Sequence, residues 1–134
     1  MRQIWPAAII PLLLFLACSS GPTEIEAELT PSQFFQQAQE ASDKGNFKLA
    51  SHYYRSFQEH YPNESERNLW AMYEIAFIYY KTGDNQSALT LFDKLLGQYA
   101  ENEAKEDAAS YPLGPLILAE KIKARIEDKE KIER

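Results

Sequence analysis

Two stretches of this chain repeat the same order of small, large and glycine residues at a spacing of 38 residues. The first stretch contains Phe34, Ala38, Ala41, Gly45, Phe47, Ala50, Tyr54, Phe57 and Pro62. The second contains Met72, Ala76, Tyr79, Gly83, Asn85, Ala88, Phe92, Leu95 and Ala100. Small residues recur where two helices must approach closely, and a glycine stands at each turn. A repeated hairpin buries its apolar face by stacking on its neighbours, which limits the fold to a solenoid-like array.

The apolar residues between the turns follow a helical spacing, and no alternating strand pattern of useful length occurs after residue 30. Thr30-Pro31-Ser32-Gln33 predicts a helix start, because Thr30 can cap, Pro31 suits the first helical position and Gln33 closes a capping box. We therefore predict an all-α fold within a domain over 30–134. Its elements are two helix-hairpin repeats over about 30–62 and 66–100, then a C-terminal helix over about 113–131.

The repeated order resembles the tetratricopeptide repeat, with its small, large, glycine, alanine, aromatic and proline positions. The resemblance covers residues 31–99 and departs from the usual pattern at Ala41, Asn85 and Ala100. It implies that the first helix of each repeat lines a concave surface. The long spacing, together with residues 57–63 and 76–84, is similar to the repeats of BamD-type lipoproteins. Those lipoproteins belong to the machinery that inserts β-barrels into the outer membrane, and a similar repeat occurs in periplasmic partners of the Tol-Pal system.

A third repeat begins at Leu113-Gly114, but Pro112 and Pro115 interrupt it. The residues that follow carry one narrow apolar stripe of Leu118, Ile122 and Ile126. A helix with a single apolar face can pack against the last repeat and expose its other face to solvent. We expect this terminal helix to close the solenoid.

The first 17 residues predict a secretory signal, since Arg2 is followed by an apolar run over 4–17 and then by small residues. The run is too short to cross about 30 Å of hydrocarbon, which disfavours a permanent membrane helix. Leu14-Phe15-Leu16-Ala17-Cys18 resembles the bacterial lipobox, although Phe15 and Leu16 depart from its commonest form. The resemblance implies that Cys18 is acylated, that 18–29 forms a lipidated tether, and that the chain lies at the periplasmic face of the outer membrane.

Charge and motif content exclude several function classes. Twenty acidic residues against 14 Lys and Arg give a net charge of −6, which disfavours nucleic acid as a partner. His52 and His60 lie about 12 Å apart along one predicted helix, too far to share a metal ion. No phosphate-binding loop or nucleophile motif occurs in the sequence. We expect neither an enzyme nor a bound cofactor or metal.

Four aromatic residues share one stripe of the first helix in the second repeat: Trp70, Tyr73, Phe77 and Tyr80. The opposite stripe already supplies the core contacts of the repeat, so this helix is apolar nearly all round. We predict that the four residues, with Phe35 of the first repeat, line a groove that binds a protein partner. The alternative is that the C-terminal helix or the tether covers them.

The combined prediction is a non-catalytic scaffold, anchored by lipid to the membrane, that binds a protein partner in outer-membrane β-barrel assembly. One alternative is an accessory lipoprotein of another envelope or transporter complex. Another is a lipoprotein that binds a small hydrophobic ligand between the aromatic stripe and the last helix.

Overall fold

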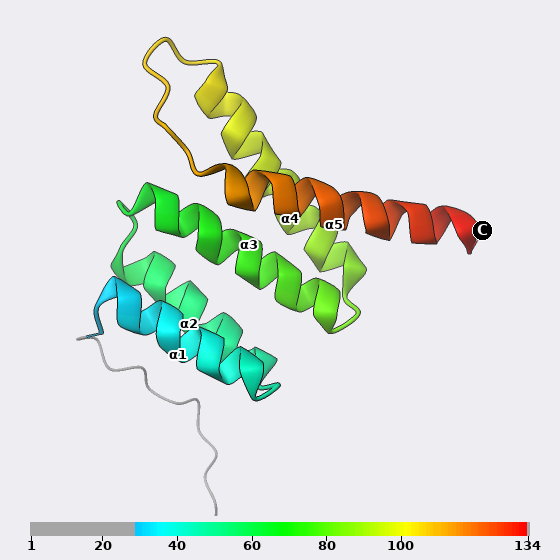
Figure 1. Cartoon of the computed structure of the whole chain (residues 1–134), viewed down its shortest axis with the longest axis horizontal. Helices are drawn as coiled ribbons and strands as arrows, with labels where there is room; N and C mark the ends of the chain where they lie inside the picture. Colours follow the sequence, from blue (N-terminus) through cyan, green and yellow to red (C-terminus); the bar gives the residue numbers. More distant parts are fainter. Residues whose placement is uncertain (1–28, 134) are drawn as a thin grey trace, which may run out of the picture.

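The computed structural model describes residues 29–133, which form five helices (Figure 1). They are α1 (Pro31–Asp43), α2 (Phe47–His60), α3 (Ser65–Lys81), α4 (Asn85–Glu103) and α5 (Leu113–Ile132). No strand occurs within the described range, and the predicted all-α class is confirmed. The predicted signal sequence over 1–17, Cys18 and all of the tether except Leu29 lie outside the described residues. None of the described helices is both long and apolar enough to cross a membrane.

The helix ends are built by the capping and turn residues that the sequence predicts. The Thr30 side chain accepts a hydrogen bond from the backbone of Gln33, and the Gln33 side chain accepts one from the backbone of Thr30. Gly45 and Gly83 adopt φ values of +73° and +86° at the two hairpin turns. Residues with a Cβ rarely adopt this conformation, so the repeated glycines are required for the sharp reversal of the chain.

The first hairpin encloses a core of small and aromatic residues. Phe34, Ala38, Ala50 and Phe57 are completely buried between α1 and α2. Ile75 and other residues of α3 pack against the same cluster from the next repeat. Alanines at the closest approach of the helices leave room for the aromatic rings beside them, as the repeated pattern predicts.

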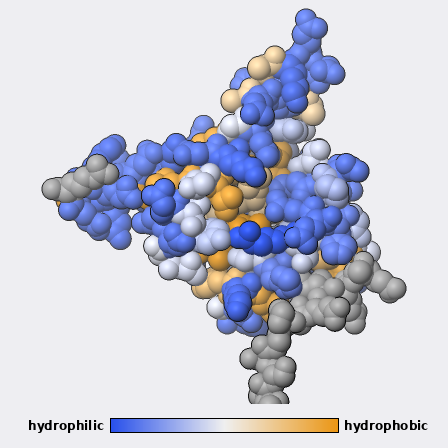
Figure 2. All heavy atoms as spheres, turned by 180° about the vertical axis from the view of Figure 1, so that it is seen from behind, coloured by the Kyte–Doolittle hydropathy of each residue, from blue (hydrophilic) through white to orange (hydrophobic). Residues whose placement is uncertain are grey.

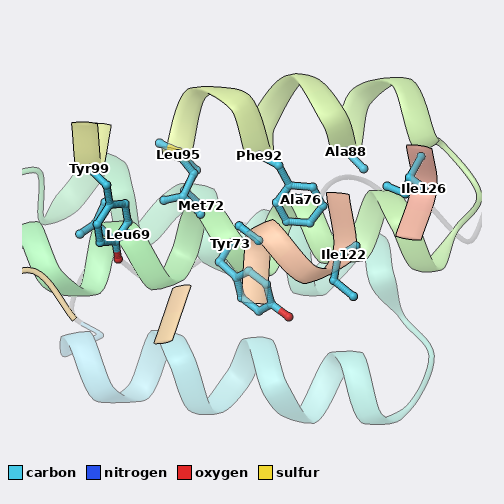
Figure 3. Packing of buried hydrophobic residues seen from close by; sticks show 11 residues of the cluster. Leu69, Met72, Tyr73, Ala76, Ala88, Phe92, Leu95, Tyr99, Ile122 and Ile126 are labelled. Atoms are coloured by element: carbon cyan, nitrogen blue, oxygen red, sulfur yellow. The ribbon is translucent and has the colours of Figure 1, made fainter. Parts of the chain in front are cut away.

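The second core cluster lies between α3, α4 and α5 (Figure 3). Ala88, Phe92 and Leu95 of α4 point toward α3, and all three are completely buried. Ile122 and Ile126 bring the apolar stripe of α5 into this cluster. The C-terminal helix therefore packs on the second repeat, as predicted.

The helices form two layers, with α1, α3 and α5 in front of α2 and α4 in Figure 1. Each helix packs on its neighbour in the chain, and α5 also crosses α3. Helices α1 and α3 both pack on α2. From behind, the surface is largely hydrophilic, with apolar patches in its central and lower parts (Figure 2). This arrangement is a short helical solenoid.

Pro115 is accommodated within the last helix. Helix α5 begins at Leu113, and Pro115 lies buried in its first turn. The first N–H groups of a helix have no partner within the helix, so a proline there removes no hydrogen bond. Between α4 and α5, Asn102 holds the connecting loop by bonding to both the N–H and the carbonyl of Ala109. Tyr99 donates to the Pro112 carbonyl at 2.6 Å.

Candidate partner-binding surface

The four aromatic residues of the predicted stripe form a continuous ladder of rings along α3. Trp70 meets Tyr73 edge to face with ring centroids 6.1 Å apart. Tyr73 stacks on Phe77 at 5.9 Å, and Phe77 contacts Tyr80 at 6.0 Å. Helical spacings of three and four residues bring these side chains to one face. We call Trp70, Tyr73, Phe77 and Tyr80 the aromatic ladder.

One end of the ladder is fixed by close packing between α3 and α5. The ring of Trp70 lies directly against Gly114, where an added Cβ would stand 2.5 Å from Cζ2 and 2.6 Å from Cη2 of the indole. No other residue type fits there unless the indole moves. The sequence shows the glycine but not its partner, because nothing in the sequence tells which residue of α3 meets α5.

The ladder is only partly open. Tyr73 is buried, with 6% of its surface exposed, and its ring also contacts Phe92 of α4. Trp70, Phe77 and Tyr80 are half-buried against the α3–α4–α5 cluster. Tyr73 is therefore a core residue, and the surface that a partner could reach consists of the other three rings.

Phe35 does not join the aromatic ladder. It packs within the first hairpin, where its ring lies 5.3 Å from Tyr54 and 5.0 Å from Phe57. It belongs to the cluster formed by α1 and α2, whereas the ladder belongs to the cluster formed by α3, α4 and α5. The predicted set of five residues is thus divided between two parts of the solenoid.

Glu74 lies on the same face of α3 as the aromatic ladder, and it was not predicted as a site residue. It follows Trp70 by four residues and precedes Phe77 by three, so it shares their face of α3. Burial raises the pKa of its carboxyl above the ordinary value. Burial also raises the pKa of Tyr54 and of Tyr73, and the charge of Glu74 raises both further. The spacing could have identified Glu74, but its burial depends on the packing of neighbouring helices.

Two exposed apolar side chains stand near the start of α5. Leu113 and Ile117 lie one turn apart and are 64% and 56% exposed. Leu113 directly precedes Gly114, the residue on which Trp70 packs. These two side chains add accessible apolar area near the contact between Gly114 and Trp70, and they were not predicted because only the buried stripe of this helix was considered.

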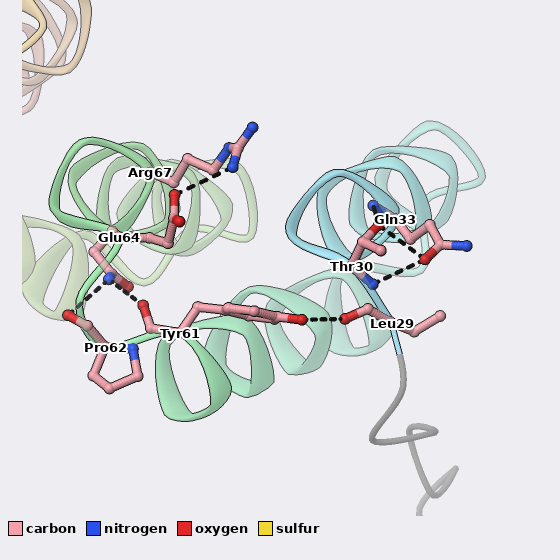
Figure 4. Close-up of polar contacts among 8 residues, drawn as sticks. Leu29, Thr30, Gln33, Tyr61, Pro62, Glu64 and Arg67 are labelled. Carbon is pink, nitrogen blue, oxygen red and sulfur yellow. Dashed lines mark hydrogen bonds and ion pairs between the residues drawn. The ribbon is translucent and has the colours of Figure 1, made fainter.

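The described part of the chain begins at a firmly held point. The Tyr61 hydroxyl, at the end of α2, donates to the Leu29 carbonyl at 2.9 Å (Figure 4). The Asn68 side chain in turn donates to the carbonyl of Tyr61 at 2.8 Å. Chain segments before α1 and after α2 are thereby tied to the first turn of α3. Leu29, the first described residue, is therefore fixed at this end of the domain.

The two histidines lie on α2 without forming a metal site. His60 makes a 2.7 Å hydrogen bond with the Ser56 carbonyl through Nδ1 and packs its ring on Phe34. Within residues 29–133, no group of three or more histidine, cysteine or carboxylate side chains is placed to hold a metal ion. His60 thus has a structural place in the first hairpin.

Residues 27–132 match the family YfiO, described as an outer membrane lipoprotein, and the match spans all five helices. The chain belongs to the YfiO family. Membership confirms the resemblance to BamD-type lipoproteins with tetratricopeptide-like repeats. Because YfiO proteins are outer-membrane lipoproteins, membership also supports the outer membrane as the location of this chain.

A longer relative shares much of this YfiO-family chain. An uncharacterized protein of Treponema pallidum (strain Nichols) is 30% identical over 109 residues, which are 79% of this chain and 44% of that protein. The chain thus spans less than half the length of this relative. No solved structure gives a significant match.

Proposed function

We propose that this chain is a non-catalytic scaffold that binds a protein partner in the assembly of outer-membrane β-barrel proteins. The family match over 27–132 is the observation that carries the proposal. It is supported by a fold made of stacked helix hairpins, which present extended surfaces to partners. An aromatic ladder beside exposed apolar residues supplies the kind of side chains that anchor protein interfaces.

We further propose that the chain is held at the periplasmic face by acylation of Cys18. Residues 1–17 would be the cleaved signal, 18–29 the tether and 30–134 the repeat domain. Cys18 is the only cysteine, so it has no disulfide partner within the chain. Acyl chains add about 0.8 kcal/mol of membrane affinity per buried CH₂, so two or three chains hold a protein firmly. An extended tether from Cys18 to Leu29 would reach about 35–40 Å.

The proposed binding surface consists of Trp70, Phe77 and Tyr80 with Leu113 and Ile117. Its centre is aromatic and partly enclosed, and its edge on α5 is open. A partner that covers Leu113 and Ile117 would remove apolar area from water at about 25 cal/mol per Å². This gain favours binding without requiring any change in the packing of α5.

Co-purification from detergent-solubilised membranes tests the proposal. A tagged full-length chain should carry a β-barrel assembly protein, identified by mass spectrometry. A double substitution of Leu113→Ser and Ile117→Ser should reduce its recovery at least about tenfold while the chain stays folded, because exposed substitutions usually change stability by less than about 0.5 kcal/mol.

Ile132→Ser is the matched control, since Ile132 is 85% exposed at the other end of α5. It should leave recovery unchanged. Recovery of a different envelope complex, also dependent on Leu113 and Ile117, would support the accessory-lipoprotein alternative instead. Equal recovery with all three variants would show that the proposed surface does not bind the partner.

A further inference from the structure

The carboxylate of Glu74 has no compensating charge. Among residues 29–133, Glu74 forms no hydrogen bond and no ion pair. Its electrostatic neighbours are the tyrosines Tyr54 and Tyr73, neither of which carries a positive charge. By contrast, each of the described ion pairs joins a basic side chain to another acid, as in Arg67 with Glu64 and Lys123 with Asp93.

An unpaired carboxylate is unfavourable where Glu74 stands. Burial removes water from the charged form, and the rings of Trp70 and Phe77 lie on the same face one turn before and after it. A partly desolvated charge destabilises the fold unless an opposite charge or hydrogen bonds compensate it. A glutamine of the same shape would avoid this cost, so the folded domain alone gives no reason for a carboxylate here.

A basic side chain from outside would supply the missing compensation. Its positive charge would pair with the half-buried Glu74 carboxylate, where charge pairing is stronger than at an open surface. Aromatic ring faces are negative, so Trp70, which lies four residues before Glu74 on the same helix face, also attracts a cation placed there. The acidic balance of the chain, with a net charge of −6, favours the approach of a basic segment.

We propose that the protein partner places an arginine or lysine side chain beside Glu74 and the ring of Trp70. This inference rests on the proposed function, since it names the chemistry of the segment that occupies the same surface. Apolar residues on either side of the basic residue lie on Tyr80 and on Leu113 and Ile117. Glu74 then selects a partner with a basic residue, whereas the aromatic and aliphatic side chains provide apolar contact area.

Synthetic peptides test this proposal. Peptides that bind the full-length chain are selected from a random phage-displayed library, and each is then made in two forms. One form carries its arginine or lysine, and the other carries citrulline in place of arginine or acetyl-lysine in place of lysine, which lack the charge. On the wild-type chain, we expect the neutral form to bind at least about tenfold more weakly than the charged form. On Glu74→Gln, we expect the two forms to bind with nearly equal affinity.

Glu66→Gln is the matched control, because it removes one exposed negative charge from the same helix. It should preserve the tenfold difference between the two peptide forms. Thermal unfolding checks that Glu74→Gln stays folded, and a variant at least as stable as wild type is expected. A Glu74→Gln chain that unfolds would overturn the proposal, since Glu74 would then support the fold.

The peptide experiment distinguishes failure of the basic anchor from failure of the proposed function. If the library yields binders whose affinity does not depend on a basic residue or on Glu74, the surface binds partners but the proposed basic anchor is wrong. If the library yields no peptide that binds the chain, both the proposed function and the basic anchor are overturned.

Discussion

At the scale of single residues, two side chains show how the environment decides the meaning of a residue type. Gly114 is needed because the Trp70 indole occupies the space where its side chain would be. Gly97, inside α4, has nothing within 4 Å of an added Cβ. The same amino acid is thus a packing requirement in one helix and a replaceable position in another.

Gly114→Ala should lower the free energy of unfolding by about 1–3 kcal/mol, because the added methyl group must displace the indole ring of Trp70. The better helix propensity of alanine offsets part of this loss. Urea unfolding measures the change. Gly97→Ala is the control and should raise stability by up to about 1 kcal/mol, since its methyl group meets open space. Equal effects at both positions would contradict the packing described for Trp70.

Glu74 predicts a pH dependence of stability. Burial raises the pKa of its carboxyl above the ordinary value of 4.5, so the folded state favours the protonated form. Its stabilising contribution is complete below the unfolded pKa and is lost as the pH rises through the folded pKa. Glu74→Gln should therefore be more stable than wild type at about pH 7, and the difference should shrink as the pH falls toward about 4.5. Denaturant unfolding at several pH values measures it, and a constant difference would show that burial of Glu74 has no effect.

At the scale of helices, the small residues of the repeat set how closely the pairs approach. Ala50 and Ala88 stand at equivalent positions of the two hairpins, and both are completely buried. Ala100 lies on the exposed side of α4, where the first repeat has Pro62. Ala50 and Ala88 should therefore tolerate a larger side chain less well than Ala100.

Ala88→Leu should overpack the contact between α3 and α4 and cost about 1–3 kcal/mol. Thermal unfolding of the full-length chain measures the loss. Ala100→Leu makes the same change on the exposed side of the same helix and should alter stability by less than about 0.5 kcal/mol. A wild-type melting temperature for Ala88→Leu would mean that the two helices pack in a different register.

At the scale of the whole molecule, the anchor and the folded domain are separate parts of one chain. The proposed lipidation site precedes Leu29, where the Tyr61 hydroxyl holds the start of the domain. Changing Cys18 should therefore alter location without altering the fold.

Cys18→Ser should abolish incorporation of a radioactive fatty acid and leave the protein uncleaved or displaced from the membrane. Its circular dichroism spectrum should stay helical, because Cys18 precedes all five helices. Ser19→Ala is the control and should retain the label. A Cys18→Ser chain that still carries the label would disprove acylation at this residue.

Much of the fold follows from local sequence rules, whereas the surface depends on long-range packing. The repeated alanines and aromatics predicted the cores of both hairpins, and the Thr30 capping box predicted the start of α1. The sequence predicted that α5 packs on the last repeat, but the stripe of Ile122 and Ile126 does not tell which side chains of α3 and α4 meet it. For the same reason the sequence could not separate buried Tyr73 from half-buried Trp70, or place Phe35 in the other cluster.

The dependence of each helix on its immediate neighbours has a mechanical consequence. The two core clusters share few side chains, Tyr79 and Leu91 among them, and α5 contacts neither α1 nor α2. A tensile load applied at Leu29 would therefore strain the Tyr61 contact and the α1–α2 hairpin before it reached the ladder. The hairpin nearest the pulling point would unfold first under load. Helices α3, α4 and α5 would stay folded and remain bound to the partner.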